Sequence, residues 1–297
     1  MTANTDILSP QSLARISNLQ LLARRVVEGF ITGLHKSPYH GFSVEFAEHR
    51  AYMPGDPIKH IDWKVWARTD RYVIKRFQEE TNLKSYILLD CSASMAFSSQ
   101  SITKLQYGVA LSAALAYLMI EQRDAAGLVL FDEKPQKVLP PRSVRSYLNL
   151  ILKELQSLKP SGKTRIAETL HNVADRMKRR GLVILISDLL DEPDEILSGI
   201  KHFRYDGHEV IVMQILDPLE RTFAFKRDAR FRDMETDEKM ISQPWHLQAA
   251  YKKVMQEYLD AIKAGCREQN ADYTLFDTTQ NYDLALMEYL KKREKLY

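Results

Sequence analysis

The 297-residue chain has only two cysteines, Cys91 and Cys266, and little excess charge of either sign. Two cysteines cannot form a disulfide framework, and so low a number is typical of a reducing compartment. The 42 basic and 39 acidic residues leave a formal net charge of +3. A general nucleic-acid-binding protein would carry a larger basic excess. We therefore expect a globular protein with no nucleic-acid partner.

Long apolar runs are also missing. The longest nearly uncharged run, residues 105–120, contains Gln106 and Ser112 and falls short of the roughly 20 residues that a membrane span needs. The first residues include Asp6 and Pro10 and lack the basic-then-apolar pattern of a signal peptide. The sequence therefore predicts no membrane span and a cytoplasmic location.

From residue 83 onward, apolar strand candidates alternate with helix candidates. The strand candidates are 85–90, 127–132, 136–139, 182–188, 209–216 and 272–276. Such alternation predicts an α/β fold, a doubly wound and mostly parallel sheet covered by helices on both faces. The second and third candidates lie so close together that they are expected to form an antiparallel hairpin at one edge. Residues 220–240 break the pattern and are predicted to be a surface excursion with a small hairpin.

The first 80 residues differ in character from the rest. They begin with apolar residues at helical spacing and continue with short strand and turn patterns. We expect residues 1–80 to form an N-terminal helix and a small α+β subdomain, and residues 81–297 to form the α/β domain. Trp63 and Trp66, together with Tyr52 and Phe77, are expected to form the core of the subdomain, since aromatic side chains contribute chiefly through buried area.

Polar side chains follow two of the strand candidates at the point where each ends. Asp90, Ser92 and Ser94 follow the first candidate, and Asp188 ends the fourth. In a doubly wound sheet of the usual order these two strands are neighbours at the switch point, where ligands bind. Thr164, in the loop between the third and fourth candidates, lies on the same rim. Two carboxylates held together favour a bound divalent cation, and hard cations prefer oxygen ligands.

This spaced set resembles the metal-ion-dependent adhesion site of the von Willebrand factor type A domain. The order of strands and helices matches that domain over about 200 residues, a typical domain length. The threonine loop departs from the usual Gly-Gly-Thr because Lys163 stands at the second glycine. The resemblance implies that Asp90, Ser92, Ser94, Thr164 and Asp188 hold Mg2+, or Mn2+ or Ca2+, with one coordination position open. An aspartate or glutamate of a partner protein would fill that position.

A second resemblance rests on the segment before the first strand candidate. It contains His40-Gly41, Glu48-x-Arg50-x-Tyr52-x-Pro54-Gly55-Asp56, Ile61-Asp62-Trp63 and Ala67-Arg68. This series is similar to the signature that precedes the type A domain in the bacterial family called domain of unknown function 58. Members of that family are typically found with MoxR-type AAA+ ATPases. The resemblance therefore implies an adaptor or co-chaperone that works with such an ATPase.

Two alternatives to this binding module stay open. Asp90 with Asp188 and Asp191 also resembles the arrangement of a haloacid-dehalogenase-type phosphatase that depends on Mg2+. That family needs a second acid where this chain has Ser92, so the expected proton donor is absent, and we expect no catalytic residues and no enzyme. The other alternative is a structural interaction protein whose metal site is vestigial.

Overall fold

The computed structural model describes Pro10 and residues 18–35, 49–51, 63–75, 83–162, 166–177, 180–225, 229–232, 239–242 and 244–296. Its centre is a six-stranded sheet in the order β10-β7-β6-β3-β4-β5. The strands are β3 (Lys84–Asp90), β4 (Ala125–Phe131), β5 (Pro135–Arg142), β6 (Leu182–Ser187), β7 (Glu209–Leu216) and β10 (Asp272–Asp277). All neighbouring pairs are parallel except β4 and β5. The predicted doubly wound sheet and its antiparallel edge hairpin are confirmed.

The composition of each strand explains its place in the sheet. Every residue of β4 and of β6 is buried, as expected for central parallel strands that are covered by helices on both faces and read as continuous apolar runs. The edge strand β5 contains Pro135, Pro140 and Pro141, which have no backbone N–H to donate. Most of its residues are exposed or half-buried. Proline is tolerated there because an edge strand has one side without a ladder.

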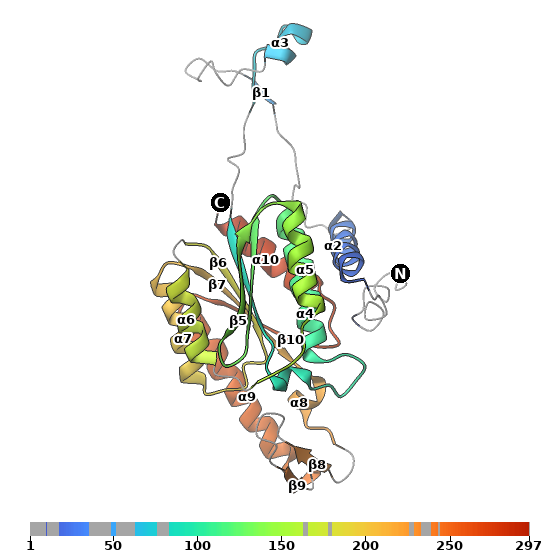
Figure 1. The fold of residues 1–297 in the computed structure, drawn as a ribbon, viewed down its shortest axis with the longest axis vertical. Coiled ribbons are helices and arrows are strands. Elements are labelled where there is room, and N and C mark those ends of the chain that lie inside the picture. Colours follow the sequence, from blue (N-terminus) through green and yellow to red (C-terminus); the bar gives the residue numbers. More distant parts are fainter. Residues whose placement is uncertain are drawn as a thin grey trace.

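Helices cover both faces of the sheet (Figure 1). One face is covered by α2 (Leu19–His35), α4 (Lys104–Glu121), α5 (Arg145–Gln156) and α10 (Asp283–Lys295), and the other by α6 (Ile166–Arg176), α7 (Pro193–Tyr205) and α9 (Pro244–Glu268). Two hydrophobic cores result, one on each side of the sheet. α4 is buried along almost its whole length, which explains why its sequence is apolar on nearly every side.

The N-terminal helix α2 packs on the α/β domain. Its buried residues, among them Leu22, Val26 and Phe30, belong to the same hydrophobic core as α4 and α10. The predicted division into residues 1–80 and 81–297 stays a prediction. The packing of α2 shows that the first of these segments contributes a helix to the core of the second.

A small unit precedes the sheet. It consists of β1 (His49–Ala51) and β2 (Val73–Lys75), which pair antiparallel, and α3 (Trp63–Thr69). Trp66 stacks on Tyr72 with ring centroids 6.0 Å apart. Trp63 is 52% exposed, so its predicted place in a subdomain core is wrong. It contacts Trp66 edge to face, and this packing leaves half of the indole in water. Tyr52 and Phe77, predicted for the same core, lie outside the described residues.

The remaining elements lie at or beyond the carboxyl end of the sheet. They are the 3-10 turn η2 (Ala93–Ala96), α8 (Pro218–Thr222) and the hairpin of β8 (Ala229–Arg232) with β9 (Lys239–Ser242). The predicted small hairpin is therefore confirmed. The predicted surface excursion over residues 220–240 is wrong at its first residue, because Glu220 belongs to α8 and its side chain is only 16% exposed.

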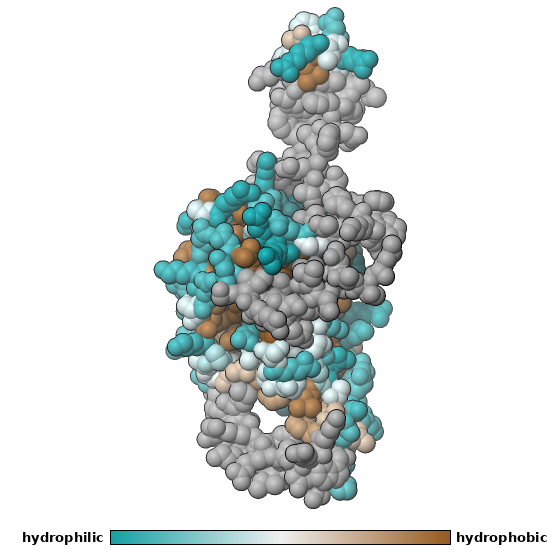
Figure 2. All heavy atoms as spheres, turned by 90° about the vertical axis from the view of Figure 1, so that its right-hand side faces the viewer, coloured by the Kyte–Doolittle hydropathy of each residue, from teal (hydrophilic) through white to brown (hydrophobic). Residues whose placement is uncertain are grey.

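No helix within the described ranges is both long and apolar enough to cross a bilayer. Figure 2 shows the face on the α2 side, where hydrophilic residues predominate over the described surface and hydrophobic ones are scattered. Scattered apolar residues of this kind are normal on a protein surface.

Candidate functional site

The sheet brings Asp90 and Asp188 to one place. β3 pairs in parallel with β6, with Leu89 opposite Ile186. Asp90 is the last residue of β3, and Asp188 directly follows the last residue of β6. Both side chains are buried. They therefore meet at the switch point of the sheet, as predicted from the strand order.

The Asp90 carboxylate is completely buried and held by two hydrogen bonds. The Ser92 amide donates to Oδ1 at 2.9 Å, and the Ser187 hydroxyl donates to Oδ2 at 2.6 Å. Burial and, after it, the neighbouring Asp188 carboxylate raise the pKa of Asp90 to about 7, against the lowering effect of these bonds. A nearby cation would stabilise the charged form of a buried carboxylate that lies beside another carboxylate.

Ser92 and Ser94 present their hydroxyls at the same point. Their Oγ atoms lie 3.0 Å apart and share a hydrogen bond, and about 3.0 Å is also the separation between adjacent ligands of an octahedral ion with bonds of ~2.1 Å. Ser92 stands at the start of η2 but makes no capping hydrogen bond with its side chain. The cap of α4 is supplied by Thr103. The side chain of Ser92 therefore caps neither η2 nor α4.

A buried lysine lies at this site, and the sequence did not predict it. Lys104 is the first residue of α4 and is fully buried. Its Nζ lies 2.7 Å from Asp188 Oδ2 and 2.6 Å from Glu220 Oε1. Burial lowers the pKa of Lys104, but the two carboxylates outweigh this and the pKa is raised overall. A cation in the first turn of a helix opposes the helix dipole, and this was the signal in the sequence that Lys104 needs acidic partners.

The hydrogen bonds continue from Lys104 into α8. Glu220 Oε2 accepts from the Asp217 amide at 2.9 Å, and Asp217 caps α8 by accepting from the Leu219 amide. The Ser99 amide donates to Asp217 Oδ2 at 2.8 Å, and the Ser99 hydroxyl donates to Asp217 Oδ1. One polar network thus joins the loop after β3, the start of α4 and the loop after β7.

Thr164, the predicted fifth ligand, lies outside the described residues. The loop that leads to it does reach the site. The Ala93 amide donates to the Gly162 carbonyl at 3.1 Å, and the Ser161 amide donates to the Cys91 carbonyl at 2.9 Å. The thiol of Cys91 is buried and donates to the Phe131 carbonyl, and burial raises its pKa to about 12. Cys91 is therefore a packed residue and not a nucleophile.

The conformation of Gly162 makes this loop sensitive to substitution. Its φ is +73°, and a Cβ there would lie 2.8 Å from Asp132 Oδ2. We expect Gly162→Ala to cost about 1–3 kcal/mol, since a residue with a side chain is strained in this region. Thermal unfolding would then shift by about 2–4 °C per kcal/mol. Unchanged unfolding temperatures would contradict the close contact between this loop and Asp132.

The donors at the site fit a small, hard cation. The carboxylates of Asp90, Asp188 and Glu220 carry more negative charge than Lys104 can balance. Among the described residues, no group of three or more histidine, cysteine or acidic side chains is arranged to hold a metal ion. The hydroxyls of Ser92 and Ser94 with the carboxylate of Asp90 would offer a cation an oxygen set that suits Mg2+ or Ca2+ better than Zn2+.

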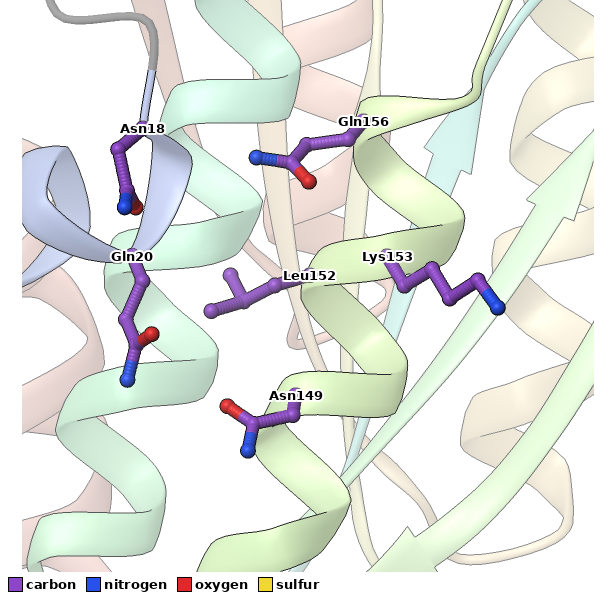
Figure 3. Close-up of a pocket in the computed structure, with 6 residues that line it drawn as sticks. All are labelled: Asn18, Gln20, Asn149, Leu152, Lys153 and Gln156. Atoms are coloured by element: carbon purple, nitrogen blue, oxygen red, sulfur yellow. The ribbon is translucent and has the colours of Figure 1, made fainter.

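A separate hollow of about 350 Å³ lies between α2 and α5. Figure 3 shows that Asn18, Gln20, Asn149 and Gln156 line it with amide groups, while the amine of Lys153 points away from α2. Neither Asp90 nor Asp188 belongs to this hollow. It brings no charged groups together, so it is not part of the candidate site.

Solved structures with a similar fold were found at low sequence identity. An aerotolerance-related membrane protein from Bacteroides fragilis has a TM-score of 0.50 and 17% sequence identity, and the match covers 70% of this chain and 98% of that one. The von Willebrand factor type A domain of SpRpn10 is more distant, with a TM-score of 0.39 and 11% identity over 70% of this chain and 95% of that one. The fold is a doubly wound α/β fold with a mostly parallel six-stranded sheet.

The sequence shows the family of the chain. Residues 48–258 match the family described as "Protein of unknown function DUF58", and the chain belongs to that family. An uncharacterized protein of Mycobacterium tuberculosis is 26% identical over 236 residues, which are 78% of this chain and 73% of the relative. The family resemblance predicted from the motifs of residues 40–68 is therefore confirmed.

Proposed function

We propose that the carboxyl end of the sheet is a cation-dependent docking site for an acidic residue of a partner protein. The observation that supports this most directly is the convergence of the Ser92 and Ser94 hydroxyls beside the buried Asp90 carboxylate. Asp90, Ser92 and Ser94 would hold Mg2+, or Mn2+ or Ca2+, with Asp188 close by and Thr164 as the further predicted ligand. The bound ion would offer an open coordination position to a carboxylate.

Hydrogen bonds and an ion pair within the chain hold the side chains of this site in place. The Ser187 hydroxyl and the Ser92 amide fix both oxygens of Asp90. Lys104 holds Asp188 in place through its ammonium group. Ser94 is only partly buried, so the hydroxyl side of the site is the side that a partner can reach. The protein's contribution is a rigid set of oxygens rather than an acid or base.

The partner proposed is a MoxR-type AAA+ ATPase, with the chain as its adaptor or co-chaperone. Membership of the family supports this proposal, because its members are typically found with such ATPases. An interaction module also fits the fold class. The proposal predicts that the complex forms in the presence of divalent ions and dissociates when they are removed.

The cation site can be tested by itself, without a partner. Titration calorimetry with Mg2+, Mn2+ and Ca2+ should give binding heat for the native chain and none for Ser94→Ala, since the alanine removes a ligand and leaves the core unchanged. Ser101→Ala is a matched control, because Ser101 is exposed on the same loop, and it should bind like the native chain. Absence of heat with all three ions would favour the vestigial-site alternative.

The partner is tested by affinity capture from the source cell, with and without EDTA. We expect an AAA+ ATPase in the captured fraction only without EDTA, and in neither fraction with Asp90→Ala. Capture of the same ATPase in equal amounts with and without EDTA would contradict the cation-dependent mechanism. A parallel assay for Mg2+-dependent phosphatase activity addresses the enzyme alternative, which would be favoured by turnover that Asp90→Asn abolishes.

A further inference from the structure

An apolar hollow lies directly beside the candidate cation site. It has a volume of about 430 Å³ and is formed by the loop after β6 and one side of α9. Its lining residues are Leu190, Asp191 and Glu192 from the loop and Tyr251, Val254 and Tyr258 from α9, with Met255 beside them. We call it the α9 hollow.

The floor of the α9 hollow is exposed apolar surface. Leu190 is 42% exposed and Val254 is 64% exposed. Residues 251, 254, 255 and 258 follow helical spacing, so they form one stripe along α9. Burying such side chains against a partner is favourable by about 25 cal/mol per Å² of apolar surface.

The loop is held in place before any partner arrives. The Tyr258 hydroxyl donates to the carbonyls of Leu189 and Asp191, the latter at 2.8 Å. Leu189 is buried and has a φ of 51°, a left-handed conformation that is costly for a branched side chain. This turn directs Leu189 into the core and leaves Leu190 at the surface, so the hollow is preformed.

The rim of the hollow is acidic. Asp191 and Glu192 line it, Asp194 and Glu195 follow, and the segment 188–200 contains no lysine or arginine. The Asp191 carboxylate accepts from the Glu192 amide. In the described part of the chain neither Asp191 nor Glu192 forms an ion pair. Lys253 of α9 does not neutralise them, because it pairs with Glu257. A basic group of a partner would therefore find uncompensated charge here.

We infer that the α9 hollow receives a bulky apolar side chain of a partner segment that also places a lysine or arginine against Asp191 and Glu192. This inference rests on the proposed function and names the partner's chemistry: an acidic residue for the cation site, followed by an apolar and a basic residue. Leu190 links the two places, because its amide donates to Asp188 Oδ1 at 3.4 Å. Two residues of extended chain span about 7 Å, so the proposed segment carries its acidic and apolar residues within a few positions of each other.

The probes are fluorescent twelve-residue peptides that differ only at three positions. The full probe carries aspartate, leucine and arginine within five residues; a second replaces arginine with glutamate, a third replaces leucine with serine, and a fourth replaces aspartate with serine. In Mg2+ we expect the full probe to bind at least tenfold more tightly than the second or third. The fourth should bind weakly and equally with Mg2+ and with EDTA, through the hollow alone.

Variants of the full chain assign the contacts. Val254→Ser and Leu190→Ser should each weaken binding of the full probe about tenfold, since both side chains are exposed and their loss leaves the core unchanged. Leu247→Ser is the matched control, because Leu247 is 45% exposed on the same helix but outside the hollow. Asp191→Lys with Glu192→Lys should reverse the preference between the arginine and the glutamate probes.

The outcomes separate this inference from the function on which it rests. If EDTA has no effect on the full probe but Val254→Ser still weakens it, the cation mechanism fails and the hollow stands. If the probes bind with Mg2+ and no variant of the hollow changes their affinity, the hollow is overturned. Sedimentation showing a dimer of the native chain that Val254→Ser dissociates would also overturn it, in favour of a second copy of this chain.

Discussion

Replacing Lys104 with methionine should destabilise the protein by about 3–5 kcal/mol, the usual effect of removing one partner from a buried ion pair. Methionine matches the length of the lysine side chain but cannot donate to Asp188 or Glu220, which lie 2.7 and 2.6 Å from the ammonium. Both carboxylates would stay in a region with little water. The loss is therefore dominated by uncompensated charge rather than by a cavity.

Urea unfolding at pH 8 without divalent ions measures this effect. Lys137→Met is a suitable control, since Lys137 is 46% exposed and also forms an ion pair, with Glu154 at 3.0 Å. Exposed pairs contribute about 0–1 kcal/mol, so this variant should unfold almost like the native chain. Adding Glu220→Gln to Lys104→Met should recover part of the loss. Equal midpoints for Lys104→Met and Lys137→Met would show that Lys104 is not a buried counter-ion.

The sheet and half of the candidate site could be predicted because their signals are local. Apolar strands such as residues 182–187 end abruptly in acids, and the doubly wound strand order then makes β3 and β6 neighbours. The strand order alone was enough to predict that Asp90 and Asp188 lie close together. The oxygens of Ser92 and Ser94 follow from their position just after β3.

The counter-ion could not be predicted in the same way. Lys104 is 116 residues away from Glu220 along the chain, and no periodicity of the sequence links the start of α4 to the loop after β7. Mixed charges around Glu220 are typical of a surface segment, whereas its carboxylate is directed inward by the buried ammonium. Trp63 was misplaced because a large aromatic side chain predicts burial, whereas the indole is 52% exposed.

Lys104 also affects how the candidate site binds a cation. Its ammonium already neutralises part of the charge on Asp188, so Asp188 attracts a divalent ion less strongly than an unpaired carboxylate would. Among the residues that the structure describes, Asp90 has no cationic partner, and its carboxylate accepts from the Ser92 amide and the Ser187 hydroxyl. The unbalanced charge therefore lies on the side of Ser92 and Ser94, which is the side where the ion is proposed to bind.

This difference leads to a second large effect, in which stability and binding change in opposite directions. Asp90→Asn should make the protein more stable than the native chain above about pH 7 without divalent ions. The pKa of Asp90 is raised to about 7 by burial and by Asp188, so its neutral form stabilises the native chain at low pH, and this contribution is lost as the pH rises through about 7. Asparagine stays neutral, and its carbonyl can still accept from the Ser92 amide.

This expectation is tested by urea unfolding of both proteins at pH 5 and pH 8, with and without Mg2+. A concentration of about 5 mM Mg2+ is high enough to occupy a weak site. The native chain should gain more from Mg2+ at pH 8 than at pH 5, because protons compete with the ion for Asp90, and Asp90→Asn should gain nothing at either pH. Asp260→Asn is the control, since Asp260 is exposed on α9 and its loss should change neither result. If Asp90→Asn is less stable than the native chain at pH 8 without Mg2+, the carboxylate is stabilised by a group other than a divalent ion, and the cation site at the end of β3 must be abandoned.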